Sequence, residues 1–435
     1  MSKVIAGMDW QELYSFASKQ ALLGLCFEGI ERLGKEYPEE LKQNPIGREL
    51  LMTWMGKAQQ IRRQNMKVNA VASKLFSMLR EDGMRCCVLK GQGNALMYPN
   101  PYSRTPGDID VWIDASRERI MEYAQKKFEL GDDIRLQHLE TSLDGVPVEL
   151  HFFPCSMNNP IYHVRLQKWF RRNADLQCSH IVGLPDGAGD IAIPTSSFNV
   201  VYQLTHLYHH FFDEGIGMRQ IIDYFLVVND FSKNVFLNND LSNHPVNFSN
   251  HPVPLSKEGS TFSPSPSSSG SGDVTAPSRC SEPLRSKDGG PSKVSPYCAG
   301  WDRLAIEGDN SATAVTSSAS TALDVVQREL KHLGLWKFAR AVMYVLHEAL
   351  GLPEEKMVAP MDEKRGKLLL AEILNGGNFG RHFTKYGHFT QQGMAKKYFL
   401  KIWRNMHFVR YYPAEALSEP IFRTWHFFWR LKHRR

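Results

Sequence analysis

The chain has 435 residues and a 42% apolar fraction, which is enough to bury a substantial core and suggests two domains plus inserts. The net charge of the chain is +6, and residues 401–435, with eight Lys or Arg and two acids, account for all of this positive excess. The charge therefore does not indicate a uniformly basic nucleic-acid-binding domain. Seven irregularly spaced cysteines fit neither a zinc motif nor a disulfide framework. Without a signal-peptide pattern or 18 uninterrupted apolar residues, we expect a cytoplasmic protein with no transmembrane helix.

Helical patterns dominate residues 1–84, which we interpret as an N-terminal helical region. Asp9 and Glu12 form a capping-box pattern at the start of a helix expected over about 10–33. A second amphipathic helix, expected over about 47–81, ends at the turn signal Asp82-Gly83.

Residues 85–195 alternate between strand and helix patterns and are interpreted as the core. The Asp144-Gly145 turn between two alternating runs predicts a hairpin. Strands are expected over 85–89, 108–113, about 135–141, 146–153, 181–184 and 191–193, and helices over about 116–130 and 164–171.

The rest of the chain is helical on both sides of a low-complexity segment. Residues 196–231 form a helical region, with helices expected over about 196–212 and 218–228. Residues 232–320 are rich in Ser, Pro and Gly, have almost nothing to bury, and are predicted to be a disordered insertion. A C-terminal helical region, 321–435, has helices expected over about 321–350, 361–374, 394–410 and 419–432.

The last of these helices carries an apolar stripe flanked by basic residues. The stripe consists of Ile421, Phe422, Trp425, Phe428 and Trp429. Docking on the protein's own core is one interpretation, and contact with an anionic membrane surface or stacking on RNA is the other.

Two aspartates stand at positions i and i+2 of an expected strand. Strand side chains alternate between faces, so Asp108 and Asp110 share one face while Ile109 and Val111 take the other. Two carboxylates on one face repel each other unless a cation lies between them. Glu149, in a second alternating strand, adds a third acid, and three such carboxylates could hold two Mg²⁺ ions for phosphoryl transfer.

Further residues around the acids suit a triphosphate. Lys90 and Arg104 could supply positive charge, and Gly91 and Gly107 could let phosphate or metal approach the backbone. His151 faces the same side as Glu149, where it could tune that acid, act as a base, or simply complete the hairpin.

Two helical spacings leave alternatives open. Arg219 could pair with Asp223 at i, i+4, or it could reach the nucleotide or the acceptor. His206 and His210 have a spacing that can bind zinc, but a helix face near the active cleft is favoured.

This set of residues resembles the nucleotidyltransferase superfamily that includes DNA polymerase beta and the minimal nucleotidyltransferases, and more closely a large, poorly characterised bacterial family within it. The resemblance covers most of residues 10–230 and, more faintly, 321–412. The matching residues are Leu89-Lys90-Gly91, Tyr98, Arg104, Gly107-Asp108-Ile109-Asp110, Glu149-Leu150-His151 and Gly215-Ile216-Gly217-Met218-Arg219-Gln220-Ile221-Ile222-Asp223.

The resemblance implies an α+β fold, with a small mixed sheet, flanking helices and the acids on neighbouring strands. It implies that Asp108 and Asp110 bind both metals and that Glu149 binds one. The sequence departs from the superfamily's usual Gly-Ser or Gly-Gly step, since it has Gly91-Gln92-Gly93 and a longer connection to the acids.

The sequence therefore predicts an enzyme that uses two Mg²⁺ to move a nucleoside monophosphate from a nucleoside triphosphate to an acceptor, with release of pyrophosphate. The acceptor is left open among a small molecule, a sugar precursor, RNA and a protein. One rival is a catalytically silent or antitoxin-like partner that keeps the fold, although retention of all three acids speaks against it. The other is a peripheral membrane or RNA-binding module built around the basic aromatic C-terminus.

Overall fold

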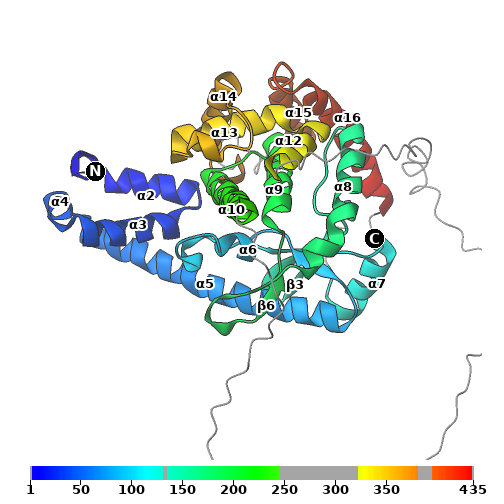
Figure 1. The fold of residues 1–435 in the computed structure, drawn as a ribbon, viewed down its shortest axis with the longest axis horizontal. Helices are drawn as coiled ribbons and strands as arrows, with labels where there is room; N and C mark the ends of the chain where they lie inside the picture. Colours follow the sequence, from blue (N-terminus) through cyan, green and yellow to red (C-terminus); the bar gives the residue numbers. More distant parts are fainter. Residues whose placement is uncertain (1, 131–134, 244–321, 381–393, 434–435) are drawn as a thin grey trace, which may run out of the picture. The chain divides into compact units, whose positions relative to one another are not determined.

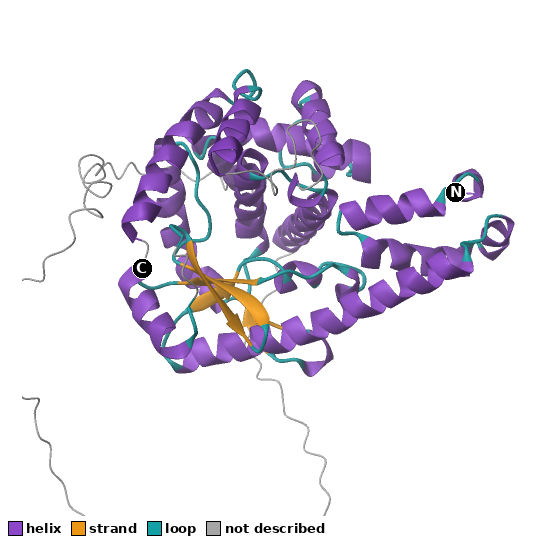
Figure 2. Cartoon of the chain, turned by 180° about the vertical axis from the view of Figure 1, so that it is seen from behind, coloured by secondary structure: helices purple, strands orange, loops and turns teal. Residues whose placement is uncertain are grey.

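The computed structural model describes residues 2–130, 135–243, 322–380 and 394–433. They form an α+β fold in which a small mixed sheet is surrounded by helices (Figures 1 and 2), as expected. Most of the expected insertion, from residue 244 onward, lies outside the described residues.

The central sheet has four strands in the order β1-β2-β4-β3. The strands are β1 (Cys86–Val88), β2 (Ile109–Ile113), β3 (His138–Leu143) and β4 (Val146–His151). β2 runs parallel to β4, whereas the β1–β2 and β3–β4 pairs are antiparallel. The expected hairpin joins β3 and β4, and both Asp144 and Gly145 have the positive φ that a tight two-residue hairpin turn needs.

The two faces of the sheet have different partners because strand side chains alternate. Ile109, Val111, Val148 and Leu150 point to one face and join a buried cluster with the long helix α5 (Arg48–Glu81) and with α7 (Arg117–Lys127). On the other face, Trp112 stacks on Phe198 of α9 (Ser196–Asp213). Figure 1 shows α5 below the sheet, with α8 (Pro160–Ser179) and α9 above it.

The N-terminal region contains a break where one continuous helix was expected. α2 (Trp10–Lys19) and α3 (Leu23–Glu36) are separated at Ala21, which has a φ of 57°. The expected cap is confirmed, since the Asp9 carboxylate accepts a hydrogen bond of 2.9 Å from the backbone of Glu12. Two short helices complete the region, α1 (Ser2–Ala6) and α4 (Pro38–Gln43).

Gln20, at the end of α2, joins three distant parts of the chain. Its side chain is buried, and its amide nitrogen donates to the carbonyl of Ile373 in α14 (Glu363–Gly376) at 3.2 Å. Its amide oxygen accepts from the backbone of Met218, the first residue of α10 (Met218–Asn243), at 2.9 Å. The break after α2 thus forms a junction rather than a loose connection.

The C-terminal helices also differ from the expected bounds. The helix expected over 321–350 is divided into α12 (Ala322–His332) and α13 (Trp336–Leu350) at Gly334, where φ is 74° and a Cβ would meet the Tyr162 ring at 2.5 Å. α10 continues to Asn243, beyond its expected end at 228. The remaining elements are α6 (Gln92–Ala95), the hairpin of β5 (Ile181–Gly183) and β6 (Asp190–Ala192), α15 (Met394–Met406) and α16 (Pro413–His433).

The apolar stripe of the last helix stays largely at the surface. Ile421 and Phe428 are 74% and 63% exposed, and Trp425 is 40% exposed, so docking of these three side chains on the core is not observed. The buried side of α16 instead contains Glu415, Ala416 and Glu419. None of the described helices is both long enough and apolar enough to cross a bilayer.

Glu415 makes the stability of the fold depend on pH. Its carboxylate is buried and accepts hydrogen bonds from the backbone N–H groups of Asn158, at 2.7 Å, and Asn159, at 3.3 Å. Burial nevertheless raises the pKa of Glu415 from 4.5 to about 7. An acid whose pKa is raised by folding stabilises the fold below its unfolded pKa, and this contribution is lost as the pH rises to the folded value.

We therefore expect the free energy of unfolding to fall by roughly 3 kcal/mol from this group between pH 4.5 and 7, at about 1.4 kcal/mol per pKa unit. Urea unfolding of the wild type and of Glu415→Gln at pH 5 and pH 8 measures it. The difference between the two proteins should change with pH. A difference that stays constant would show that Glu415 remains ionised throughout.

Candidate active site

The strand register collects polar side chains on one face of the sheet. Asp110 of β2 lies opposite Glu149 of β4, which in turn lies opposite Glu140 of β3. One step along the strands, His151 lies opposite His138. Residues paired across a ladder point to the same side, so these five side chains form two adjacent rows above the sheet.

Three carboxylates meet at the start of this face. Asp108 directly precedes β2, and ligand atoms of Asp108, Asp110 and Glu149 all lie within 4.8 Å of one another. Within the described part of the chain, the buried Oδ2 of Asp110 has no hydrogen-bond partner. Such an oxygen is normally satisfied, and a divalent cation with its preference for oxygen ligands would satisfy it here. The three acids therefore fit a metal site.

The acids have opposite pKa shifts because their neighbours differ. The charge of Asp110, and then burial, raise the pKa of Asp108. Burial also acts to raise the pKa of Asp110, but Lys90 and His151 hold it below the ordinary value. Burial raises the pKa of Glu149. The site thus holds more negative charge than it can easily accommodate, which favours cation binding.

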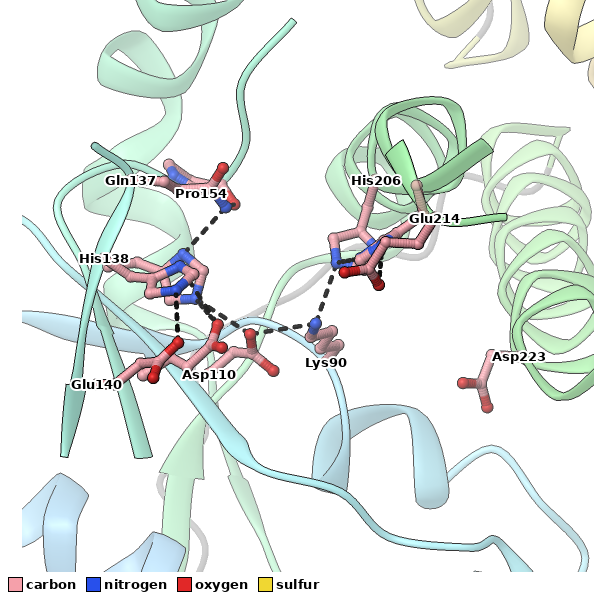
Figure 3. A network of polar contacts seen from close by, with 12 residues as sticks. Lys90, Asp110, Gln137, His138, Glu140, Pro154, His206, Glu214 and Asp223 are labelled. Carbon is pink, nitrogen blue, oxygen red and sulfur yellow. Dashed lines mark hydrogen bonds and ion pairs between the residues drawn. The ribbon is translucent and has the colours of Figure 1, made fainter. Parts of the chain in front are cut away.

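Lys90 connects the acids to helix α9 (Figure 3). Its Nζ lies 3.1 Å from Oδ1 of Asp110 and 3.0 Å from Nε2 of His206, which lies 3.1 Å from Nε2 of His210. Burial lowers the pKa of His206, so its neutral ring accepts a hydrogen bond from the ammonium. This contact uses the nitrogen that a zinc ion between His206 and His210 would need, and it places α9 beside the carboxylates.

Arg104 does not have a free guanidinium for a nucleotide. It is 5% exposed, and its Nε and Nη2 each donate to Asp223 at 2.8 Å. The hydroxyl of Tyr98 donates to the same carboxylate at 2.8 Å. Arg104 therefore holds the loop before β2 on α10, and its assignment to the nucleotide stays a prediction.

Arg219 is not in the simple i, i+4 pair with Asp223 that its spacing allows. Its Nη1 donates to the carbonyl of Thr105 at 2.9 Å, and its buried Nε has no hydrogen-bond partner among the described residues. Burial, and then the nearby charge of Arg104, lower the pKa of Arg219. Arg219 is thus an incompletely neutralised cation beside the loop that leads to Asp108.

The two glycines assigned to nucleotide binding serve in different ways. Gly91 has a φ of 65° at the turn from β1 into α6, a conformation that other residues rarely adopt. Gly107 is exposed, and no described atom lies within 4 Å of the position its Cβ would take. The approach to Asp108 is therefore open on the side of Gly107.

His151 lies between two of the acids. Its Nε2 is 3.0 Å from Oδ1 of Asp110 and 3.2 Å from Oε2 of Glu149. Although burial opposes it, hydrogen bonds to these carboxylates raise the pKa of His151 to about 9. His151 therefore positions both acids and supplies a positive charge between them.

Comparison with known proteins identifies the family of this chain. Residues 6–242, more than half of the chain, match the family described as uncharacterised nucleotidyltransferase. The chain belongs to this family. The search among curated proteins gave no match.

One solved structure is similar to this chain. It is that of an antigenic nucleotidyltransferase-like protein from Paracoccidioides brasiliensis. The sequence identity is 16%, the match covers 40% of this chain and 90% of that chain, and the TM-score is 0.25.

Two partners in the site of this nucleotidyltransferase were not identified by the motifs. His138 lies outside every motif, although the two-residue turn at Asp144-Gly145 places it opposite His151 once the hairpin is accepted. His206 was noted for its spacing to His210, but no pattern in the sequence relates it to Lys90, 116 residues away.

Proposed function

We propose that this protein is a Mg²⁺-dependent nucleotidyltransferase that moves a nucleoside monophosphate from a nucleoside triphosphate to an acceptor and releases pyrophosphate. The observation that carries the proposal is the convergence of Asp108, Asp110 and Glu149 within 4.8 Å. When bound, two Mg²⁺ ions would neutralise the triphosphate and the charge that develops on the attacking and leaving oxygens.

In this proposal the side chains of the protein position the triphosphate and neutralise its charge. Asp108 and Asp110 would hold both ions, and Glu149 would hold one. Lys90, held beside Asp110, binds the triphosphate as a point charge. Gly91 and Gly107 leave the backbone accessible to phosphate. Catalysis would rest on orientation and on charges that are already in place.

Two further residues act around this centre. Arg219 has a buried Nε without a partner in the described residues, so we assign it to an anionic group of the nucleotide or the acceptor. His151 is a positioning residue, because it holds Asp110 and Glu149 in place through its Nε2. The acceptor class stays open among a small molecule, a sugar precursor, RNA and a protein.

A labelling experiment tests the proposal. The purified protein is incubated with a cell extract, Mg²⁺ and each of the four nucleoside triphosphates labelled at the α-phosphate. We expect label from at least one of them to appear on an acceptor, with release of pyrophosphate, and both to vanish with a chelator or with Asp110→Asn.

Nucleotide binding without transfer in any of the four reactions would instead favour the catalytically silent or antitoxin-like rival. The second rival, a membrane or RNA module, predicts that removing residues from 418 onward abolishes retention on vesicles or RNA. If the shortened protein loses retention on vesicles or RNA but still transfers nucleotide, membrane or RNA binding is separate from the transfer reaction.

Removing the positive charge of Lys90 or of Arg219 should weaken triphosphate binding. Lys90→Met and Arg219→Gln are each expected to reduce the affinity for Mg²⁺ and a non-hydrolysable triphosphate by about 1–3 kcal/mol, since each removes a charge-assisted hydrogen bond. Isothermal titration calorimetry measures the loss. Lys74→Met is the matched control, because Lys74 forms only an exposed ion pair with Asp144. If the wild type and the three variants bind the triphosphate equally tightly, Lys90 and Arg219 serve only to stabilise the fold.

A further inference from the structure

His138 has an unusual environment for a buried side chain. It is 8% exposed, and within the described residues neither ring nitrogen has a hydrogen-bond partner. Buried polar groups are almost always satisfied, so an exception calls for a missing water or ion.

The atoms nearest to His138 have the geometry of a metal site. Its Nδ1 lies 3.4 Å from Oε2 of Glu149, and Nε2 of His151 lies 3.2 Å from the same oxygen. Ligand atoms of the three residues all lie within 4.8 Å of one another. Ligands about 2.0–2.1 Å from a tetrahedral zinc ion are separated by roughly 3.3–3.4 Å, which is close to the 3.4 Å and 3.2 Å found here.

The surroundings also suit metal-binding histidines. The other nitrogen of His138, Nε2, lies 3.8 Å from the carboxylate of Glu140, which forms an ion pair with Arg135 (Figure 3 shows His138 and Glu140). Carboxylates near the second nitrogen are common around metal-binding histidines, but 3.8 Å is longer than a hydrogen bond. Nδ1 of His151 lies 3.3 Å from the side-chain amide of Gln137. The amide nitrogen of Gln137 also donates to the carbonyl of Pro154, at 3.2 Å.

We propose that His138, Glu149 and His151 form a second, inhibitory site for a transition-metal ion, with Zn²⁺ as its preferred occupant. Two imidazoles and one carboxylate suit zinc, whereas Mg²⁺ prefers oxygen ligands. Glu149 belongs both to this site and to the site of Asp108 and Asp110. A zinc ion on the two histidines therefore withdraws Glu149 from the all-carboxylate site, and the two kinds of ion exclude each other.

Binding is tested first, because it does not depend on the proposed reaction. Zn²⁺ binding to the full chain is measured by competition with a chromophoric chelator, and Co²⁺ is used as a visible probe of coordination. His138→Gln should reduce the Zn²⁺ affinity about 10- to 100-fold or more and remove the tetrahedral Co²⁺ absorption. The matched control, Asp108→Asn, should keep both, because Asp108 belongs only to the carboxylate site. Glu149→Gln should weaken both Zn²⁺ and Mg²⁺ binding.

Other side chains that bind zinc are present in both the wild type and the variants, so they do not affect the difference in Zn²⁺ affinity between them. Circular dichroism and thermal unfolding establish that each variant is folded, and His138→Asn replaces His138→Gln if the latter is not. Equal Zn²⁺ affinity in the wild type and the folded His138 variant overturns the site. So does loss of Zn²⁺ binding in Asp108→Asn alone, which would place zinc on the three carboxylates.

Inhibition rests on the proposed function and is tested separately. In the labelling reaction, Zn²⁺ at a fixed Mg²⁺ concentration should stop transfer by the wild type at concentrations that leave the His138→Gln variant active. Additional Mg²⁺ should reverse this inhibition. Zinc binding at His138 without any transfer would refute the proposed reaction and leave the metal site standing. Equal sensitivity of both proteins to Zn²⁺ would refute the inhibitory role.

Discussion

Asp108→Asn is expected to abolish nucleotidyl transfer while leaving the free energy of unfolding unchanged or slightly higher. The substitution removes a negatively charged ligand that we assign to both metal ions. It also relieves repulsion, because the charge of Asp110 is the main cause of the raised pKa of Asp108. Steady-state transfer assays and thermal unfolding with and without Mg²⁺ measure the two effects.

Asp114→Asn is the matched control for this prediction. Asp114 directly follows β2 and pairs with Arg85, so the same chemical change occurs at the other end of the same strand. It should leave transfer close to that of the wild type. An Asp108→Asn variant that stays folded and keeps full activity would remove Asp108 from the reaction.

Asp223→Ala should destabilise the protein by about 3–5 kcal/mol. Asp223 accepts two hydrogen bonds of 2.8 Å from Arg104 and one of 2.8 Å from Tyr98, and all three side chains are buried. Removing the carboxylate leaves two buried partners unsatisfied and brings the repulsion between Arg104 and Arg219 into effect. Chemical denaturation measures the change in the free energy of unfolding.

The control for this prediction is Asp175→Ala in α8, which removes an exposed ion pair with Arg85. Exposed pairs contribute about 0–1 kcal/mol, so a much smaller change is expected. A loss of less than about 1 kcal/mol in Asp223→Ala would show that water reaches Arg104 when the carboxylate is absent.

Local patterns in the sequence predicted much of the core. Alternation of polar and apolar residues placed Asp108, Asp110 and Glu149 in or beside strands, and the Asp144-Gly145 turn predicted the hairpin that aligns Glu140 with Glu149. The cap at Asp9 was also correct. Each of these features depends on residues that are close in the sequence.

Features that depend on distant residues were missed. The parallel pairing of β2 with β4 aligns Asp110 with Glu149, and because no turn determines that register, only the resemblance placed the acids on neighbouring strands. The pairing of Arg104 with Asp223, which lies 119 residues away, was not predicted. The helix breaks at Ala21 and Gly334 coincide with positive φ angles at these residues, which helical periodicity does not contain.

The junction at Gln20 has a consequence for synthesis of the protein in the cell. The side chain of Gln20 donates to a carbonyl that lies 353 residues further along the chain. At translation rates of roughly 5–20 residues per second, the ribosome needs about 20–70 s to reach that partner. During this interval the side chain of Gln20 lacks its acceptor, so the junction at the end of α2 can be completed only after α14 has been made.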